Sequence, residues 1–484
     1  MTIPDWALPA VVMLPLLAGL AAFVAPRIAP AIGVLASVAN LGLVAYLARC
    51  VLLEGVLEQH LGSWMPPLGI AIRLDGLAAS MLLMTAVVAT AISIYAASYY
   101  RARDGGSFWP LWLFLLASMA ALYVSGDLFN LYVTLELLGI AAVALTTIAA
   151  NEQAPRAATR YLLASLAGSL TYLLGVALTY HGSGSVDIAI VGQDFGTGGS
   201  SASTAALALM TAGLLLKSAL FPLHFWLPAA HSSASAPVSA AMSALVVKGA
   251  FFILLRLWLE AFSPVDPPFL AMLGALGGAA VIWGSVVALM QQRAKLLIAY
   301  STVAQIGYFF LALPLVTENT LAWSAIVLLV IAHGFAKAAM FLAVGNLQSF
   351  AGHDRVADLN RVVQRMPVTI AALGLSGVSI MGLPPSGGFN GKWLLIQSAA
   401  AQGRWDIAGV FLIGGLLAGA YVFKLLAQAF TPGDDVGDTG FVAASREFSA
   451  LGLAVVSMLL GFLTMPWLAL IGVASALTPA GAPG

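Results

Sequence analysis

The sequence predicts an all-α polytopic membrane protein with about fourteen transmembrane helices. Hydrophobic residues make up 61% of the 484 residues and charged residues only 8%, whereas about 25% of the residues of a soluble domain are charged. Apolar runs of about 20 residues, the length that a helix needs to cross a bilayer, recur along the whole chain. Continuous runs indicate helices, because the strands of a membrane barrel alternate apolar and polar residues.

The expected spans are separated mostly by short connections, and only residues 182–203, 348–364 and 431–446 form long polar ones. We therefore expect no separate soluble domain. The first span follows a nearly uncharged start, which favours a membrane helix over a cleaved signal peptide. The expected spans cover residues 4–24, 31–53, 77–98, 107–124, 127–148, 156–181, 205–230, 237–262, 268–290, 296–314, 321–345, 367–402, 408–430 and 449–474.

The distribution of basic residues among the loops predicts the orientation of the chain. Loops after odd-numbered spans contain eleven lysines and arginines, and loops after even-numbered spans contain three. Because basic loop residues concentrate on the cytoplasmic side, we expect both termini on the non-cytoplasmic side of a bacterial-type inner membrane. The first group is Arg27, Arg101, Arg103, Arg156, Arg160, Arg293, Lys295, Arg355, Arg361, Arg365 and Arg446, and the second is Arg49, Arg73 and Arg404.

Two spans, the seventh and the twelfth, are too long for simple crossings and contain breaks. Pro222 and Pro228 interrupt the seventh, and Pro384 and Pro385 interrupt the twelfth. A helix can break at membrane depth only where its freed backbone faces protein or water, and transporters build ion sites at such breaks.

The two broken spans run in opposite directions, and each is the fourth of five consecutive spans. We therefore expect two inverted five-helix repeats, formed by the fourth to eighth and the ninth to thirteenth helices. The four expected parts of the chain are residues 1–104 with the first three helices, 105–264 with the first repeat, 265–432 with the second repeat, and 433–484 with the last loop and helix.

Ionisable residues inside the spans are candidate functional residues, because a charge at the bilayer centre costs about 2.5–3.5 kcal/mol. Glu136 lies in the fifth span and Lys217 precedes the break of the seventh. We expect them to pair, since a buried carboxylate needs a cation nearby. A buried lysine that loses its carboxylate partner tends to release its proton, so opening this pair would move a proton. The alternative is a fixed pair that only holds the helices together.

A series of further titratable residues extends toward the second break. Lys248 lies in the middle of the eighth span, His333 and Lys337 lie four residues apart on one face of the eleventh, and Lys392 follows the second break. A series of this kind predicts a proton path across the membrane. The alternative for each residue is that it lines a small wet pocket without relaying a proton.

Two histidines lie in the broken region of the seventh span. His224 follows Pro222, and His231 lies near the end of the span. Either side chain can relay or gate protons, and either can instead bond carbonyl groups that the break frees. Arg256 and Glu260, four residues apart, are expected to form a local ion pair.

Several chemistries are excluded by the composition. A single cysteine, Cys50, excludes internal disulfides, cysteine-ligated iron–sulfur clusters and thiolate zinc sites. No nucleotide-binding glycine motif follows a strand pattern, so we expect no cofactor and no metal in this chain, and no nucleic acid as a partner. No carboxylates cluster at membrane depth, which favours protons over Na+ as the ion carried.

Four blocks of the sequence are characteristic. They read KSALFPLHFWLPAAH at 217–231, ELL at 136–138, HGFAKAAMFLAVG at 333–345 and GLPPSGGFNGKWLL at 382–395. Together they resemble the antiporter-like, proton-translocating subunits that respiratory complex I, membrane-bound hydrogenases and Mrp-type Na+/H+ antiporters share. The resemblance covers roughly the fourth to thirteenth helices and implies the same inverted-repeat fold and other integral membrane subunits as partners.

The resemblance also implies roles for individual residues. Glu136 and Lys217 correspond to the family's glutamate–lysine pair, and Lys248 corresponds to its central lysine. His333 and Lys337 correspond to the connecting residues. Lys392 corresponds to the terminal lysine of the second half-channel.

Three functions are compatible with this resemblance. The length, Lys392 and the GDLFNLYV block at 126–133 look most like the D-type subunits of Mrp antiporters, whereas His231 is shared with the complex I and hydrogenase branches. We expect a proton-translocating subunit of a multisubunit Na+/H+ antiporter, without enzymatic activity of its own. The alternatives are a proton-pumping subunit of a complex I-like or hydrogenase-type redox complex, and a proton-conducting partner of an inorganic-carbon uptake complex.

Overall fold

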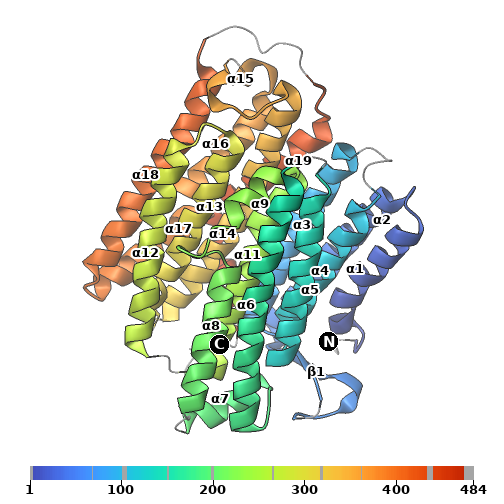
Figure 1. The fold of residues 1–484 in the computed structure, drawn as a ribbon, viewed down its shortest axis with the longest axis vertical. Helices are drawn as coiled ribbons and strands as arrows, with labels where there is room; N and C mark the ends of the chain where they lie inside the picture. The colour runs from blue at the N-terminus through green and yellow to red at the C-terminus, as the bar shows by residue number, and fades with distance from the viewer. Residues whose placement is uncertain are drawn as a thin grey trace.

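The computed structural model describes residues 4–67, 69–100, 106–149, 152–197, 201–263, 266–316, 320–360, 362–432 and 440–473. They form a bundle of helices with a small β-hairpin and a short helix, α7, at one end (Figure 1). Among the described residues, eleven helices are long and apolar enough to cross a membrane. The predicted class of helical membrane protein is therefore confirmed.

The N-terminal part consists of three long helices and the hairpin between the second and third. Strands β1 and β2 pair antiparallel, with Leu57 opposite Leu74. The sequence analysis did not anticipate this hairpin, because its strands are only four residues long and partly polar. The elements are α1 (Ala7–Val24), α2 (Ala29–Glu54), β1 (Leu57–His60), β2 (Ala71–Leu74) and α3 (Gly76–Tyr99).

The next group of helices contains the first break, between α8 and α9. Asp127 caps the N-terminus of α5, since its carboxylate accepts a hydrogen bond from the Asn130 amide at 2.6 Å. The helices are α4 (Phe108–Val124), α5 (Leu128–Thr147), α6 (Ala154–Ser183), α7 (Ile188–Gly196), α8 (Ser201–Lys217) and α9 (Leu227–Ser233).

Two long helical segments lie at the centre of the bundle. In Ala236–Ala261 and in Leu321–Ala351, every residue of the most apolar stretch is buried. The first segment contains two π-helical stretches. In chain order the elements here are α10 (Ala236–Ala241), the π-helix η2 (Met242–Val246), α11 (Val247–Arg256), the π-helix η3 (Leu257–Ala261), α12 (Pro267–Met290), α13 (Ala294–Leu311) and α14 (Thr320–Ala351).

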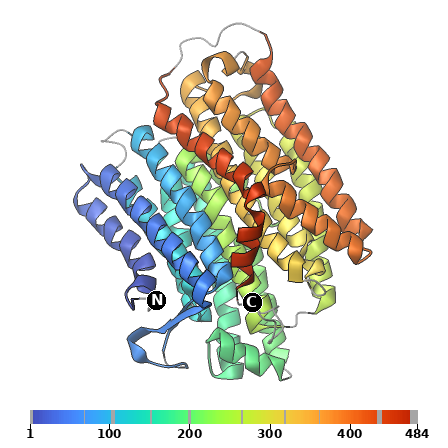
Figure 2. The ribbon, with the colours of Figure 1, turned by 180° about the vertical axis from the view of Figure 1, so that it is seen from behind.

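The C-terminal helices bring the chain back across the bundle. Seen from behind, α19 and α20 run diagonally over it (Figure 2), and α19 packs against α3, α14 and α16. This part contains α15 (Val362–Arg365), α16 (Pro367–Met381), α17 (Gly387–Ala401), α18 (Trp405–Phe430), α19 (Ala444–Phe462) and α20 (Thr464–Gly472).

Both predicted breaks are present, with shifted boundaries. α8 ends at Lys217, before Pro222, and α9 begins only at Leu227. The second break spans only the residues between Met381 and Gly387, so that Lys392 lies inside α17. The proline positions alone could not indicate these boundaries, because each helix ends where its last carbonyls find other partners.

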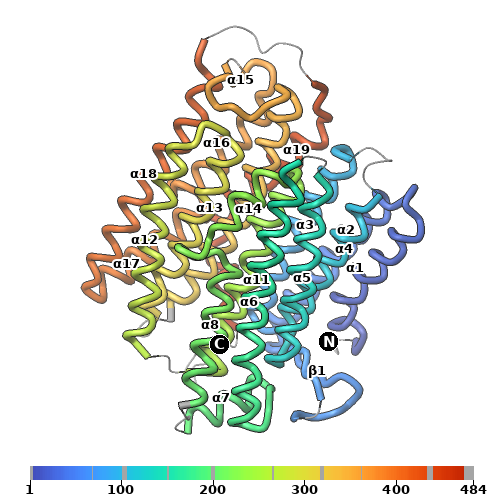
Figure 3. The backbone as a smooth tube through the Cα atoms, viewed as in Figure 1, coloured from blue at the N-terminus to red at the C-terminus, as the bar shows by residue number. Residues whose placement is uncertain are grey.

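The two ends of the described chain lie near the hairpin. The Gln59 side chain donates a hydrogen bond to the Asp5 carbonyl at 3.1 Å, and the Gly76 amide donates to the Val473 carbonyl at 3.1 Å. We call this end of the bundle the hairpin face, and α15 lies at the opposite end (Figure 3). Of the predicted features, Arg101, Arg103, Arg361 and the part boundaries at 104/105 and 264/265 fall outside the described residues.

Candidate functional site

The structure brings Glu136 and Lys217 together, as the sequence predicts. The Lys217 Nζ lies 3.6 Å from Glu136 Oε2 and donates a hydrogen bond to the Leu135 carbonyl at 3.2 Å. The Ser169 hydroxyl on α6 donates a further hydrogen bond to Glu136 Oε2. The lysine side chain is 6% exposed and the carboxylate 17% exposed, so the pair is largely buried and the glutamate lies closer to the surface of the chain.

Glycines on two helices make room for the lysine. A Cβ on Gly139 of α5 would lie 3.2 Å from Lys217 Nζ. A Cβ on Gly168 of α6 would lie 2.9 Å from Lys217 Cγ and 2.9 Å from the Gly213 carbonyl oxygen. Small residues let membrane helices approach closely. Here they allow α5, α6 and α8 to enclose one lysine side chain.

A cavity of about 10 Å³ lies beside Lys217 and is lined by Tyr161, Ser165 and Trp226 among others. This volume holds about one water molecule. Trp226 donates a hydrogen bond to the Leu216 carbonyl at 3.0 Å, and its ring stacks on Tyr161 with the centroids 4.3 Å apart. The tryptophan therefore adds a second hydrogen bond to a carbonyl at the end of α8, which also accepts one from the Ala219 amide at 3.2 Å. Sequence reasoning missed these residues, because a tryptophan beside a break resembles an interfacial anchor.

Lys248 lies at the centre of the bundle, beside the first π-helix. Its Nζ donates a hydrogen bond to the Ser243 carbonyl at 2.8 Å, and the Ser243 hydroxyl lies 2.9 Å from that of Thr302 on α13. The lysine side chain is fully buried. Single π-helical turns inside longer helices occur frequently at functional sites.

His333 and Lys337 continue the series on α14. The Lys337 Nζ donates hydrogen bonds to the Ile298 carbonyl at 3.1 Å and to the Ser301 hydroxyl. His333 is buried, and neither of its ring nitrogens has a hydrogen-bond partner within the described residues. His333 lies on the same face of α14 as Lys337, one helical turn before it.

Lys392 is held differently from Lys217. Its Nζ donates hydrogen bonds to the carbonyls of Ile380 at 2.8 Å and Met381 at 3.4 Å. The ammonium also lies 4.3 Å from the centre of the Tyr308 ring, a cation–π contact. No carboxylate among the described residues forms an ion pair with Lys392. The sequence indicated this lysine but none of its partners.

The two histidines of the first break are buried among aromatic rings. His224 packs against Phe221 and Trp283, with ring centroids 5.6 Å and 4.5 Å away. His231 stacks on Phe341 at 4.6 Å, and neither of its ring nitrogens has a partner within the described residues. Within the described residues, His231 therefore bonds to no freed carbonyl.

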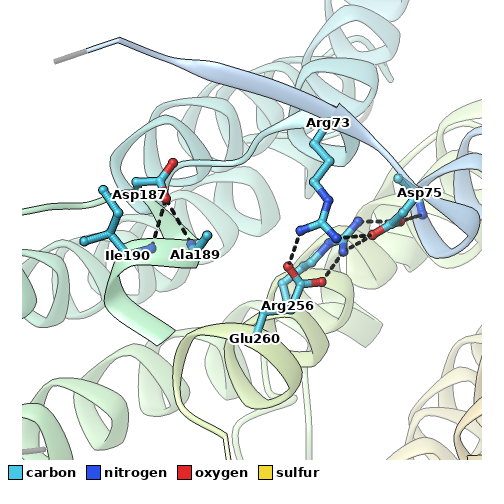
Figure 4. A network of polar contacts seen from close by, with 8 residues as sticks. Arg73, Asp75, Asp187, Ala189, Ile190, Arg256 and Glu260 are labelled. Carbon is cyan, nitrogen blue, oxygen red and sulfur yellow. Dashed lines mark hydrogen bonds and ion pairs between the residues drawn. The ribbon is translucent and has the colours of Figure 1, made fainter. Parts of the chain in front are cut away.

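The expected pair between Arg256 and Glu260 is present and belongs to a larger network. Arg256 also binds Asp75 at the start of α3, and Arg73 of β2 binds Glu260 (Figure 4). A local pair was predictable from the four-residue spacing, whereas the partners from the hairpin region were not. Within the described residues, no group of three or more histidine, cysteine or acidic side chains could hold a metal ion.

An apolar helical bundle with two helices broken beside buried lysines defines a class, the ion-translocating subunits of membrane complexes. The chain belongs to the family described as NADH:quinone oxidoreductase/Mrp antiporter, transmembrane, whose profile matches residues 125–418. The predicted resemblance is thereby confirmed. The match covers both breaks and every lysine of the series.

Relatives come from two branches of this family. NADH-quinone oxidoreductase subunit N of Desulforudis audaxviator is 35% identical over 415 residues, which cover 84% of this chain and 81% of that protein. The D-type Na(+)/H(+) antiporter subunit of Alkalihalophilus pseudofirmus is 28% identical over 388 residues, which cover 80% and 78%. The chain is thus a multi-pass, antiporter-like membrane subunit of the Mrp or complex I type.

A solved structure has the same fold. A chain of the Mrp complex from Dietzia sp. DQ12-45-1b superposes with a TM-score of 0.91 and covers 98% of this chain and 97% of its own length, at 24% sequence identity. The whole described bundle, including the N-terminal helices outside the family match, therefore follows one known architecture.

Proposed function

We propose that this chain is the proton-translocating subunit of a multisubunit monovalent cation (Na+)/H+ antiporter in a bacterial inner membrane. The observation that carries the proposal is the buried Glu136–Lys217 pair at the end of α8, 3.6 Å apart and hydrogen-bonded to Ser169. Buried ion pairs are weak stabilisers of a fold, so their presence favours a functional role. Other integral membrane subunits complete the cation route, as the relatives named as antiporter subunits suggest.

In this proposal the pair works as a switch for the charge of Lys217. While Glu136 is close, the carboxylate stabilises the ammonium form of the lysine. When the pair opens, desolvation disfavours the ammonium, and the proton moves on toward Lys248. Glu136 is the member that can leave, because its side chain is 17% exposed, whereas that of Lys217 is only 6% exposed.

The remaining lysines act as successive proton carriers. Each of Lys248, Lys337 and Lys392 bonds to main-chain carbonyls, which hold the amine in position in either protonation state. His333 links them, since both of its ring nitrogens are open to accept or donate a proton. His231 has the same property and serves as a relay or gate nearer the first break, as does His224, whose Nδ1 also lacks a partner within the described residues.

The proposal includes fourteen crossings in two inverted repeats, with the hairpin face on the non-cytoplasmic side. Eleven long helices and three shorter apolar ones, α4, α8 and α16, overlap the predicted spans within the described residues. The four parts 1–104, 105–264, 265–432 and 433–484 follow from this layout. The nearness of both chain ends to the hairpin supports an even number of crossings.

We further propose that the chain carries no cofactor and no metal, and catalyses no reaction by itself. The series of lysines with few carboxylates supports protons rather than Na+ as the ion that passes through it. The second candidate function is a proton-pumping subunit of a redox complex. It is favoured by the relative named as an NADH-quinone oxidoreductase subunit at 35% identity.

Purification of the intact complex through a tag on this chain tests the assignment. In mild detergent, its visible and EPR spectra are recorded beside a mass-spectrometric analysis of the co-purifying subunits. A colourless assembly of several membrane proteins is the expected result. Iron–sulfur or flavin signals would favour the redox complex instead, and a single large zinc protein would favour the carbon-uptake complex.

A further inference from the structure

Asp75, Arg256, Glu260 and Arg73 form a charged network at the hairpin face, and their side chains are increasingly exposed in this order. Arg256 Nη2 lies 2.7 Å from Asp75 Oδ1, and Arg256 also binds Glu260. Arg73 Nη1 lies 3.0 Å from Glu260 Oε2 (Figure 4). The side chains of Asp75 and Arg256 are 3% and 4% exposed, that of Glu260 is 14% exposed and that of Arg73 is 29% exposed. The network thus extends from the interior of the bundle to its surface.

The inner end of this network lies on the same helix face as the central lysine. Lys248, Phe252 and Arg256 follow one another at four-residue intervals along α11. The Arg256 guanidinium lies 5.1 Å from the centre of the Phe252 ring. The Tyr123 ring on α4 meets Phe252 edge to face, with the centroids 4.8 Å apart. Two aromatic rings therefore separate Lys248 from the network.

Two buried hydroxyl groups lie beside these rings, those of Tyr123 and of Thr85 on α3. They lie next to each other, but neither makes a hydrogen bond of normal geometry within the described residues. Buried polar groups in proteins are nearly always hydrogen-bonded, either to protein or to ordered water. Two such groups at one aromatic barrier indicate a site that water can reach.

The two hydroxyls lie near the depth of the lysine. Thr85 follows Asp75 by ten residues, which places it roughly 15 Å along the axis of α3. Lys248 precedes Arg256 by eight residues, or about 12 Å along α11. Asp75 at the start of α3 and Arg256 at the end of α11 are bonded to each other. Depths along the two helices can therefore be measured from this contact at the hairpin face.

The outer end of the network opens into a polar cavity. A volume of about 40 Å³ is lined by Arg73, Arg256, Glu260, Glu58 and Asp187 among others. Since one probe sphere of about 10–15 Å³ suffices for a water molecule, the cavity has room for a few. A network that only fastened helices together would account for the ion pairs, but not for this cavity or for the unbonded hydroxyls.

The two carboxylates of the network differ in their surroundings. Burial alone would raise the pKa of Asp75, but the charge of Arg256 and its hydrogen bonds outweigh this effect and hold the pKa below its usual value. Asp75 therefore stays ionised and holds Arg256 in position. Glu260 also binds Arg256 and Arg73, so it takes up a proton only when these ion pairs open. It is the more exposed carboxylate and lines the cavity.

We propose that Glu260 is a second proton-exchange site of this chain, connected to Lys248 past Phe252 by the hydroxyls of Thr85 and Tyr123 and by water. In outward transfer, the Lys248 ammonium loses one proton and becomes a neutral amine, and the Glu260 carboxylate gains one and becomes a carboxylic acid. Glu260 then releases that proton to water in the cavity. This inference rests on the proposed function, because it assumes that Lys248 carries protons.

Several charged groups act on Glu260 and bear on its pH response. α7 packs against the π-helix that contains it, and Asp194 of α7 is exposed to solvent. The charged groups that share the network or the cavity with Glu260 are Glu58, Arg73, Asp75, Asp187 and Arg256.

The test uses the intact complex in liposomes that contain a pH-sensitive dye. Proton transport is measured while the pH on the hairpin face is varied, with the orientation determined from the accessibility of a tag. We expect Tyr123→Phe, Thr85→Val and Glu260→Gln each to slow transport by about tenfold or more, because a positioned proton-transfer group contributes at least this much to a rate. Glu260→Gln should also flatten the dependence on the pH of the hairpin face alone.

Tyr172→Phe is the matched control. Tyr172 is equally buried, but its hydroxyl donates a hydrogen bond to the Leu128 carbonyl at 3.3 Å. We expect this variant to transport at the wild-type rate. Lys217→Ala in the same assay tests the proposed function separately, since wild-type transport by that variant would refute the proton path as a whole.

The inference would be overturned by wild-type rates and wild-type pH profiles in Tyr123→Phe and Thr85→Val complexes, while Lys217→Ala is inactive. The network would then be only a structural lock. If the Glu260→Gln complex does not assemble, the transport rates and pH profiles of Tyr123→Phe and Thr85→Val decide the question. Each of these variants loses a hydroxyl group and nearly keeps the size of the side chain.

Discussion

The two broken helices hold their lysines in different ways. At the first break, Lys217 pairs with a carboxylate 3.6 Å away. At the second, Lys392 bonds to two carbonyls and lies over the Tyr308 ring. The two ammonium groups also differ in the helix whose carbonyls they meet. Lys217 is the last residue of α8, but its ammonium bonds to a carbonyl of α5. The carbonyls that bind Lys392 belong to the last residues of α16.

The two breaks therefore stabilise their lysines by different means. The C-terminus of a helix carries partial negative charge and stabilises a nearby cation, so the second break itself provides part of the Lys392 site. Among the described residues, a carboxylate pairs with the lysine only at the first break. We infer that the carboxylate switches the charge of the lysine at the first break, while Lys392 carries its proton without a charged partner.

The largest effect is expected from breaking the ion pair. Lys217→Ala or Glu136→Ala should lower proton transport by about a hundredfold or more, because the proton-releasing group or its partner is lost. The complex should still assemble, as checked by mass spectrometry of its subunits, and transport is measured in liposomes. Loss of assembly would instead indicate that the pair only holds the helices together.

A matched control for these variants is Lys424→Ala. Lys424 also bonds to carbonyls at a helix end, those of Leu289 at 2.7 Å and Gln291 at 2.8 Å. It lies outside the proposed path. Transport should persist in this variant even where the stability of the complex falls.

Reversing the charge at the second break should have the next largest effect. Lys392→Glu should slow transport by about tenfold or more, because the new carboxylate would face the carbonyl oxygens of Ile380 and Met381 instead of donating to them. The same liposome assay measures this effect. Wild-type transport would show instead that any titratable group suffices there and that the hydrogen bonds to the two carbonyls are not needed.

The aromatic ring below Lys392 should contribute a smaller effect. Tyr308→Leu removes the cation–π contact, and we expect about a fivefold loss of transport, equivalent to about 1 kcal/mol. Tyr308→Phe keeps the ring and should transport nearly as well as the wild type. Equal rates in the two variants would show that the ring does not act on the lysine.

The smallest effect concerns the backbone of the second break. Gly382 has a φ of +84°, and a Cβ there would lie 2.7 Å from Lys392 Cδ. Gly382→Ala should lower stability by about 1–2 kcal/mol, because a left-handed conformation disfavours a side chain. Gly374→Ala is the control, since nothing lies within 4 Å of its Cβ position. The melting temperature of the complex should fall only in the first variant.

Much of this protein was predictable from its sequence. The apolar runs predicted the helices, the prolines and glycines predicted both breaks, and the cost of burying charge identified Glu136 and Lys217 as partners. These properties are local, since a residue carries its hydrophobicity, its charge and its backbone preferences wherever the chain places it. A carboxylate and a lysine at membrane depth can also satisfy each other only by meeting.

Only the tertiary structure decided which uncharged groups complete the sites. Lys392 finds carbonyls on α16 and a ring on α13, and Ser169 reaches Glu136 from another helix. Arg73 meets Glu260 across 187 positions of sequence. Carbonyls, serines and aromatic residues occur on every helix of the bundle. Their partners follow from how the helices pack, and the pattern of a single helix does not record that packing.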